Sequence, residues 1–201
     1  GIAKAGEGLL QITSASTYSG ATTVTSGTLS VAGAAGRILG TGSLSVSDGG
    51  TLQDGSPSAA NNSGVSNRIN TAANLAMGSA TGGGTFILST AASGGTHTQD
   101  LASVSINGGA NTVSVLADAG ATSTLTFTSA SPYNHTAGSV NFLQNPGVGG
   151  SIVLLNAPSG AGNVSGGLLI GAFLNSTNLV AAQSGVLTAF SGWIPTGTAT
   201  W

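Results

Sequence analysis

Residues 4–31 read KAGEGLLQITSASTYSGATTVTSGTLSV. Every second position in short runs carries an apolar or β-branched side chain: Leu10 and Ile12, Thr22 and Val24, Leu29 and Val31. A two-residue period predicts strands with one buried face. Gly, Ser or Thr closes each run, as at Gly20, Gly27 and Gly33, so these strands are short and no helical pattern follows them.

The same pattern recurs further along the chain. When TTVTSGTLSV is aligned with SLSVSDGGTLQD, Val24 matches Val46 and Leu29 matches Leu52, a shift of about 22 residues. This shift is typical of one coil of a parallel β-helix, in which each strand pairs with its equivalent in the next coil. Coils of about 20 to 23 residues predict roughly nine coils and a rod about 40 Å tall.

Low charge favours such a stack over a β-sandwich. Charged residues make up 4% of the chain, whereas about a quarter is usual in soluble domains. In a stack of parallel coils, like residues form vertical rows, where Thr, Ser and Asn can hydrogen-bond to one another and equal charges would repel. We therefore expect an all-β protein, a parallel β-helix with hydroxyl and amide side chains on its outside.

The opening stretch also resembles a known family. Lys4-x-Gly6-x-Gly8-x-Leu10-x-Ile12 is followed by Thr17-Tyr18-Ser19-Gly20, Thr22-Thr23-Val24 and Gly27-Thr28-Leu29-x-Val31. This pattern is similar to the autotransporter-associated β-strand repeat, also called the passenger-associated transport repeat, with Ser16 where the family usually has Asn. The resemblance implies a right-handed β-helix in a long exported chain that serves in surface display, adhesion or filament formation, without catalysis.

A weaker resemblance covers the rest of the chain. Arg68, the runs GGGTFIL, SINGGANTVSV and GSVNF, and Gly192-Trp193 resemble longer β-rich units of very large surface proteins in planctomycete-like bacteria. The resemblance of the opening stretch implies coils of the autotransporter-associated β-strand repeat over 1–56. We expect an irregular connecting segment over 57–80 and further β-helix coils over 81–201, all in one continuous solenoid. A loop is favoured over a short helix at 67–77, and a second loop is expected at 129–137.

Expected strands in the later part follow the same period. They cover 86–89, 103–106, 112–116, 123–128, 138–143, 151–155, 167–170 and 185–190. The longest apolar run, 168–174, is far short of the roughly 20 residues that span a bilayer. The first residues lack the pattern of a signal peptide, so we expect a piece of a longer chain or a processed one. No transmembrane helix is predicted.

Composition excludes several classes of function. The formal net charge is -2 and only Lys4, Arg37 and Arg68 are basic, so the clustered cations that nucleic acid requires are absent. There are no cysteines and two histidines, which leaves neither disulfides nor a zinc site. With 40% hydrophobic residues at strand spacing, the chain is predicted to fold despite its Gly, Ser and Thr content.

Candidate chemistry is sparse. The carboxylates are Glu7, Asp48, Asp54, Asp100 and Asp118. We interpret the aspartates as turn residues that bond to their own backbone, His97 as a solvated loop residue, and His135 as a turn residue. A Ser-His-Asp set with Asp100 can be written on paper, but such a set is recognised by geometry. SDGGTLQDG lacks the spacing of a calcium-binding repeat. We predict no catalytic, cofactor or metal site.

Aromatic residues divide into two groups. The phenylalanines have the spacing of core residues: Phe86, Phe127, Phe142, Phe173 and Phe190. Loop or end positions are expected for the others, Tyr18, Tyr133, Trp193 and Trp201. These can stack on sugars or cover an end coil, and covering is favoured for the two tryptophans.

We therefore expect a structural, non-catalytic β-solenoid module of a bacterial extracellular or cell-surface protein, acting in surface display, adhesion or end-to-end filament assembly. Its expected partner is a second copy or the rest of a longer repetitive chain, with cell-surface polysaccharide as a further candidate. The alternatives are a glycan-binding or glycan-cleaving β-helix protein and a component of a surface-layer or viral shell. No cofactor is expected.

Overall fold

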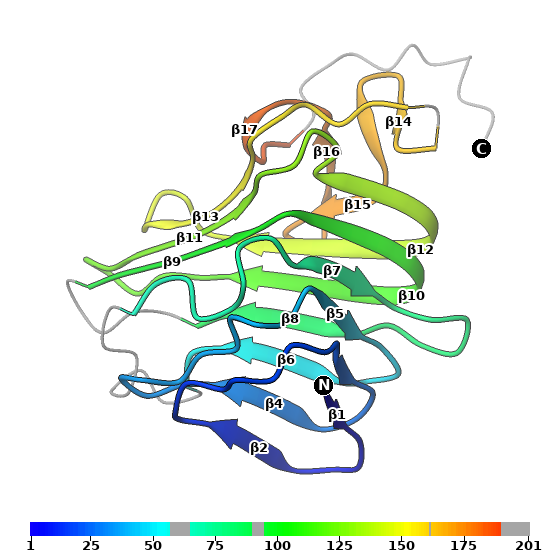
Figure 1. Cartoon of the computed structure of the whole chain (residues 1–201). Coiled ribbons are helices and arrows are strands. Elements are labelled where there is room, and N and C mark those ends of the chain that lie inside the picture. The colour runs from blue at the N-terminus through cyan, green and yellow to red at the C-terminus, as the bar shows by residue number, and fades with distance from the viewer. Residues whose placement is uncertain (57–64, 90–94, 161, 190–201) are drawn as a thin grey trace.

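The chain folds as a parallel β-helix, as the sequence predicts. The computed structural model describes residues 1–56, 65–89, 95–160 and 162–189. These residues contain seventeen strands and no helix. Strands that follow one another around the coil stack on their equivalents in the next coil, from the N-terminal end to the C-terminal end of the molecule (Figure 1).

Two of the three strand stacks run the length of the molecule. The first contains β1 (Ile2–Lys4), β3 (Thr22–Val24), β5 (Ser43–Val46), β7 (Asn74–Met77) and the first halves of β10 (Ser103–Val115) and β12 (Tyr133–Gln144). The second contains β2 (Leu9–Ile12), β4 (Thr28–Val31), β6 (Thr51–Asp54), β8 (Thr85–Leu88), the second halves of β10 and β12, and β15 (Leu168–Leu174). All these pairings are parallel.

A third stack forms only in the upper part. It contains β9 (Thr96–Leu101), β11 (Thr122–Phe127) and β13 (Gly150–Leu154). Nearer the N-terminus, single parallel bridges between Ala15 and Arg37 and between Ile38 and Ile69 replace it. The first coils are thus too short to form a third regular strand.

The register that the internal repeat predicts is confirmed. Val24 pairs with Val46, and Leu29 pairs with Leu52. Inward residues of the second stack continue this column, in order Leu10, Leu29, Leu52, Phe86, Val113, Phe142 and Leu174. Successive members of the column are 19, 23, 34, 27, 29 and 32 residues apart. The described part therefore has seven rungs, fewer than the nine expected, because the coils lengthen after the second.

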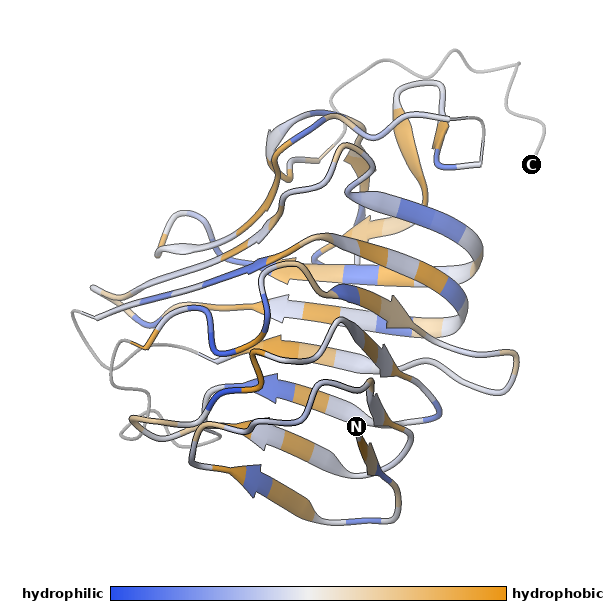
Figure 2. Ribbon diagram, in the orientation of Figure 1, coloured by the Kyte–Doolittle hydropathy of each residue, from blue (hydrophilic) through white to orange (hydrophobic). Residues whose placement is uncertain are grey.

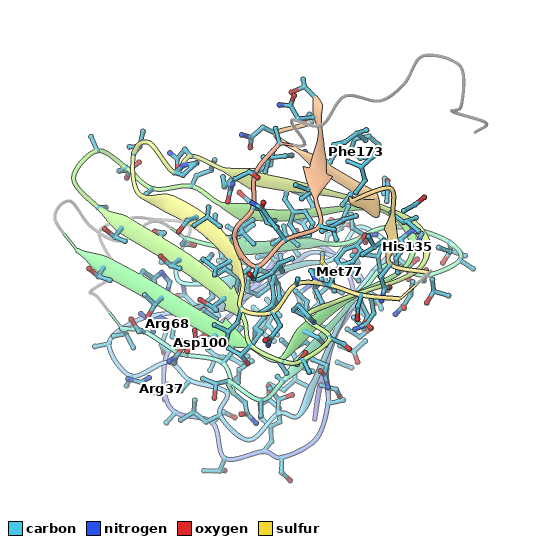
Figure 3. All side chains as sticks on the ribbon, turned by 90° about the horizontal axis from the view of Figure 1, so that it is seen from above. Arg37, Arg68, Met77, Asp100, His135 and Phe173 are labelled. Carbon is cyan, nitrogen blue, oxygen red and sulfur yellow. The ribbon has the colours of Figure 1, made fainter. Side chains whose placement is uncertain are left out.

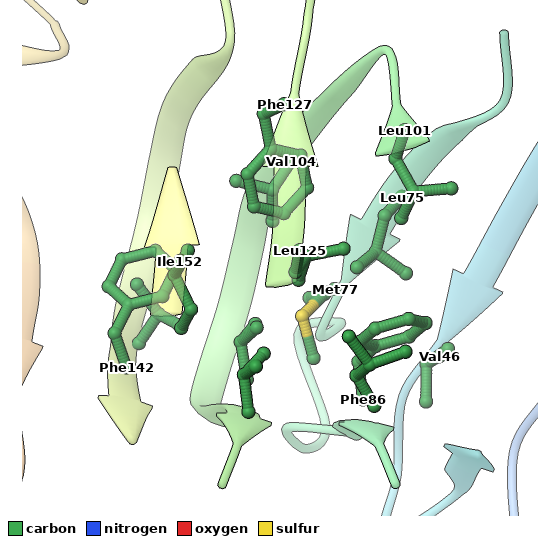
Figure 4. Packing of buried hydrophobic residues seen from close by; sticks show 14 of the residues in the cluster. Val46, Leu75, Met77, Phe86, Leu101, Val104, Leu125, Phe127, Phe142 and Ile152 are labelled. Atoms are coloured by element: carbon green, nitrogen blue, oxygen red, sulfur yellow. The ribbon is translucent and has the colours of Figure 1, made fainter. Parts of the chain in front are cut away.

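Hydrophobic and more polar residues alternate along many of the strands (Figure 2), and the buried hydrophobic residues form one core cluster. Val46, Leu75 and Met77 meet Phe86 from the neighbouring stack, and Leu125, Phe127 and Ile152 enter from the third (Figure 4). Outward hydroxyl and amide groups bond between rungs in places, as Thr124 and Ser151 do at 3.3 Å and Ser103 and Asn74 do at 2.8 Å.

Strands β10 and β12 each continue around a corner of the coil, where the sequence predicted separate or shorter strands. The predicted segments 103–106 and 112–116 are both parts of β10, and Gly109 bends it with a φ of 62°. Gly138 occupies the corresponding corner of β12, with a φ of 82°. A Cβ atom on Gly138 would lie 2.4 Å from the carbonyl oxygen of Gly109. Glycine at this corner lets consecutive coils approach closely.

The C-terminal end of the described part departs from parallel stacking. The short strands there are β14 (Val164–Ser165), β16 (Asn178–Ala181) and β17 (Gly185–Val186). All three pair antiparallel: β14 and β16 with β15, and β17 with β13. A bridge between Val180 and Ala189 also joins β16 to the segment after β17. This antiparallel pairing was not expected from the sequence.

Two further expectations were tested in part. No helix forms over 67–77, and residues 74–77 are strand β7. The predicted loop at 129–137 ends earlier than expected, because Tyr133 already begins β12. Three of the aromatic residues with predicted roles, Phe190, Trp193 and Trp201, lie outside the described residues.

Candidate functional site

The three basic side chains serve the main chain. Each donates to carbonyl oxygens, Lys4 to Gly6 and Ser26, Arg37 to Ser66 and Asn67, and Arg68 to Gly33 and Gly36. The last two sets join coils that lie about 30 residues apart in sequence. These cations therefore form charge-assisted hydrogen bonds to main-chain carbonyls, and the two arginines do so between coils.

A polar cluster lies inside the core where the short coils meet the longer ones. Asp54 is the last residue of β6, and its side chain is fully buried. Its Oδ1 atom is 3.2 Å from Nε2 of His97 and 3.6 Å from Nε of Arg68. Among the residues that the structure describes, the Oδ2 atom of Asp54 has no hydrogen-bond partner. Two cations thus surround one buried carboxylate.

The surroundings of His97 favour its protonated form. Nδ1 is 2.7 Å from the carbonyl oxygen of Ser89, while Nε2 faces Asp54. Both partners are acceptors, so both ring nitrogens have to donate. Burial by itself would lower the pKa of His97, but the hydrogen bond and charge of Asp54 and the carbonyl of Ser89 outweigh it and raise that pKa.

Two sequence interpretations are therefore wrong. His97 is a buried residue of β9 instead of a solvated loop residue, and Asp54 is a core residue instead of a turn residue. The sequence did indicate that Asp54 is buried, because Asp54 lies two positions after the inward Leu52 in the same strand and therefore on the same face. His97 and Asp100 are three residues apart in one strand, so they lie on opposite faces and form no triad.

Asp48 is an exposed residue among the predicted turn aspartates. Its φ is 53°, as in a left-handed turn. The carboxylate accepts hydrogen bonds from the hydroxyls of Ser79 at 2.7 Å, Thr81 at 2.6 Å and Ser47 at 2.8 Å. These bonds lower the pKa of Asp48, with that from Thr81 contributing most. Asp48 is a turn residue, as predicted, but its partners are side chains of a distant loop as well as its neighbour.

The remaining candidates lie elsewhere. Figure 3 shows Arg37, Arg68 and Asp100 on one side of the molecule and His135 on the other. His135 belongs to β12, so its interpretation as a turn residue is wrong. Tyr133 is buried in the same strand, and its hydroxyl donates to the carbonyl of Ile170 at 2.5 Å. Phe173 was expected in the core but is 40% exposed.

Asparagine side chains join successive coils, a role that the sequence did not reveal. Oδ1 of Asn145 accepts from the amide of Ala117, and its Nδ2 donates to the carbonyl of the same residue, both at 2.8 Å. Oδ1 of Asn111 accepts from the amide of Gly84, and its Nδ2 donates to the carbonyl of Ser139. Each partner lies about one coil away, so spacing along the chain gives no local signal.

The chemistry available to this arrangement is limited. Among residues 1–56, 65–89, 95–160 and 162–189, no three His, Asp or Glu side chains gather as metal ligands do. The one carboxylate beside a histidine, Asp54, is buried within the core and faces Arg68. Ser89 offers His97 its carbonyl oxygen, while the Ser89 hydroxyl accepts from Gln53. Within the described part of the chain, the cluster joins coils.

The fold and the site define the class of protein as an all-β solenoid. Its buried polar side chains bond to other parts of the same chain and hold the coils together. In the comparison with known families, residues 2–31 match the model of the passenger-associated transport repeat. These residues are therefore such a repeat, as the opening motif indicates, and it covers β1 to β4. No curated protein and no solved structure matches the chain.

This repeat and the solenoid together fit a structural surface module, and the repeat indicates a secreted or surface protein. Within the part of the chain that the structure describes, no helix is long and apolar enough to span a membrane.

Proposed function

We propose that the chain is a structural, non-catalytic module that displays other parts of a surface protein at a distance from the cell. The observation that carries this proposal is the use of the charged groups. All three cations and the carboxylates of Asp48 and Asp54 bond to other parts of the same chain. In an enzyme, such groups would converge on substrate.

The distance that the module can span follows from the number of stacked rungs. Seven rungs at about 4.8 Å give a rise of roughly 29 Å from the first to the last. Each coil buries its apolar residues against its neighbours, so stability grows with the number of coils.

A display assay tests this function. The chain would be placed between an outer-membrane anchor and a short epitope, and antibody binding to intact cells would be measured. We expect strong binding with the native chain and a large loss with Leu29→Asp, which removes the fold. Equal binding by both would contradict a spacer role, because an unfolded linker would then suffice.

The glycan-binding alternative has one feature in its favour. Phe173 is exposed beside the Asn141–Ser176 pair, whose side chains bond at 2.8 Å, and sugars stack on aromatic faces next to amide groups. Adhesion to cell-surface polysaccharide would then depend on Phe173. A glycan array with the native chain and Phe173→Ala separates the two functions: a signal lost in the variant supports binding, and no signal in either supports display. Release of oligosaccharides by the native chain would overturn the non-catalytic proposal.

A further inference from the structure

Asn-x-Ser/Thr sequences mark asparagines that can carry an N-linked sugar in an exported protein. The chain has four of them, which begin at Asn61, Asn134, Asn163 and Asn175. Asn61 lies outside the described residues, so the structure compares the other three. An N-linked sugar is joined to the side-chain nitrogen Nδ2, which therefore has to be accessible. The three asparagines differ in how this atom is held.

Asn134 and Asn163 are half-buried, and the main chain engages the Nδ2 atom of each. Nδ2 of Asn163 donates to the carbonyl oxygen of Ser159 at 2.9 Å, and its Oδ1 atom accepts from the amide of His135 at 2.8 Å. Nδ2 of Asn134 donates to the carbonyl oxygen of Ser131 at 3.3 Å. A sugar at either position would compete with these bonds, so neither asparagine is a good acceptor in the folded chain.

Asn175 is presented differently, in the tight turn between β15 and β16, where Asn175 and Ser176 have φ values of 50° and 65°. Asn175, Ser176 and Thr177 are all exposed. Oδ1 of Asn175 accepts a hydrogen bond from the amide of Gln144, one rung below, at 2.9 Å. Because a main-chain amide can only donate, this bond fixes the position of the oxygen and turns Nδ2 away from Gln144. Nδ2 of Asn175 donates to no residue that the structure describes.

This turn is held against the side of the solenoid. Phe173, just before it, pairs with Asn141 in the outward row of the second stack and is 40% exposed. Asn141 bonds to Ser176 twice: its Oδ1 atom accepts from the amide and its Nδ2 atom donates to the hydroxyl, both at 2.8 Å. The turn is thus ordered, and the exposed ring of Phe173 offers a surface on which an attached sugar can stack.

We propose that Asn175 is an N-glycosylation site, which goes beyond the display role. The donor is a sugar diphosphate, and a separate enzyme catalyses the transfer. The bond from the anomeric carbon of the sugar to the diphosphate oxygen breaks, a bond from that carbon to Nδ2 of Asn175 forms, and Nδ2 loses one proton. The hydrogen bond from Gln144 to Oδ1 can persist in the product, because the oxygen takes no part in the transfer.

Mass spectrometry of the chain, isolated from the cells that naturally produce it, tests the site directly. After digestion with a protease of broad specificity, peptides that contain residues 173–177 should be heavier than their sequence by a whole number of sugar units. Peptides with Asn134 or Asn163 should have the mass of their sequence. An unmodified Asn175, or a sugar at Asn134 or Asn163 in its place, would overturn the proposal.

An acceptor assay tests whether the fold selects Asn175. The purified chain, with Asn61→Gln to remove the fourth motif, would be incubated with a nucleotide-activated hexose. The enzyme would be a soluble N-glycosyltransferase that modifies short peptides with each of the other three motifs. The folded chain should gain one hexose, and Thr177→Ala should gain none although it keeps the bond between Asn175 and Gln144.

The matched control is Ser165→Ala, which removes the motif at Asn163. This variant should still gain one hexose. A folded chain that gains no hexose, or one that loses its hexose in Ser165→Ala and keeps it in Thr177→Ala, would contradict the proposal. Neither result would affect the display assay, since that role needs only the folded stack.

Discussion

Nε2 of His97 lies 3.2 Å from Oδ1 of Asp54, although the two residues are 43 positions apart in sequence. Asp54 ends a strand of the second stack, and His97 is the second residue of the first regular strand of the third. The contact therefore joins two faces of the solenoid at the level where the coils lengthen. It is also the one ion pair of a histidine in the described residues.

This contact predicts that stability decreases with rising pH. The pKa of His97 is raised above its ordinary value of 6.5 in the folded state, so its contribution is complete below pH 6.5 and is lost as the pH rises through the folded pKa. Urea midpoints measured from about pH 6 to pH 9 should fall for the native chain. This decrease in the midpoint should be smaller in His97→Gln than in the native chain. In His135→Gln the decrease should be as large as in the native chain. A native midpoint that rises over this range would contradict the assignment.

Core residues of the predicted column should be indispensable. Leu29 and Val46 are fully buried, and aspartate in either place would leave an unpaired charge among apolar side chains. We expect Leu29→Asp or Val46→Asp to cost more than about 4 kcal/mol and to abolish folding. Circular dichroism and thermal unfolding provide the measurement. Thr28→Asp, one position along and partly exposed, should keep the fold; normal heat resistance in the core variants would oppose the coil architecture.

Glycine at the corner of β12 should resist substitution. Gly138→Ala combines a φ of 82° with a Cβ contact of 2.4 Å to the backbone of Gly109. Gly120 is the matched control, because its φ is 79° but nothing lies within 4 Å of an added Cβ. Gly120→Ala should cost about 1–2 kcal/mol from backbone strain alone. Gly138→Ala should cost clearly more in chemical denaturation, and equal costs would argue against close approach of the coils.

Asparagine contacts between coils should contribute measurably. Asn145→Ala removes both bonds to the main chain of Ala117 and leaves that amide without its partner. We expect a loss of about 1–3 kcal/mol in the free energy of unfolding. Asn178→Ala, which loses only a bond to the adjacent Thr177, should change stability by less than about 0.5 kcal/mol. Similar values for both variants would deny that Asn145 joins coils.

Alternation along the chain was enough to predict the stack. Val24 and Val46, and Leu29 and Leu52, pair as the repeat indicated because each strand repeats the pattern of the one below. THTQDL, which forms β9, was missed because its inward positions include polar His97 and Gln99. Gln99 is satisfied by the main chain of Ile69, 30 residues away. Partners at that distance are visible only once the coils are stacked.

The antiparallel pairing of β14, β16 and β17 could not be predicted from the sequence for a related reason. Antiparallel pairing of β16 with β15 depends on a tight reversal at Asn175 and Ser176, both with positive φ. Their sequence context resembles that of the earlier turns, so period and turn residues alone do not distinguish a reversal from a new coil. Phe173 was placed in the core because it is a large apolar residue, but it stands between the inward Ala172 and Leu174 and pairs with Asn141, so alternation puts it on the outer face.

Parallel, in-register stacking is tested most directly by distances between spin labels along one outward row. Thr28, Thr51, Thr85, Thr112, Asn141 and Phe173 occupy successive rungs of the second stack. With one label at Thr28 and the second at Thr112, Asn141 or Phe173, the backbone separations should be about 14, 19 and 24 Å. A regular increase of about one strand spacing per rung is the expected result. Distances that fail to grow in this order would contradict the solenoid.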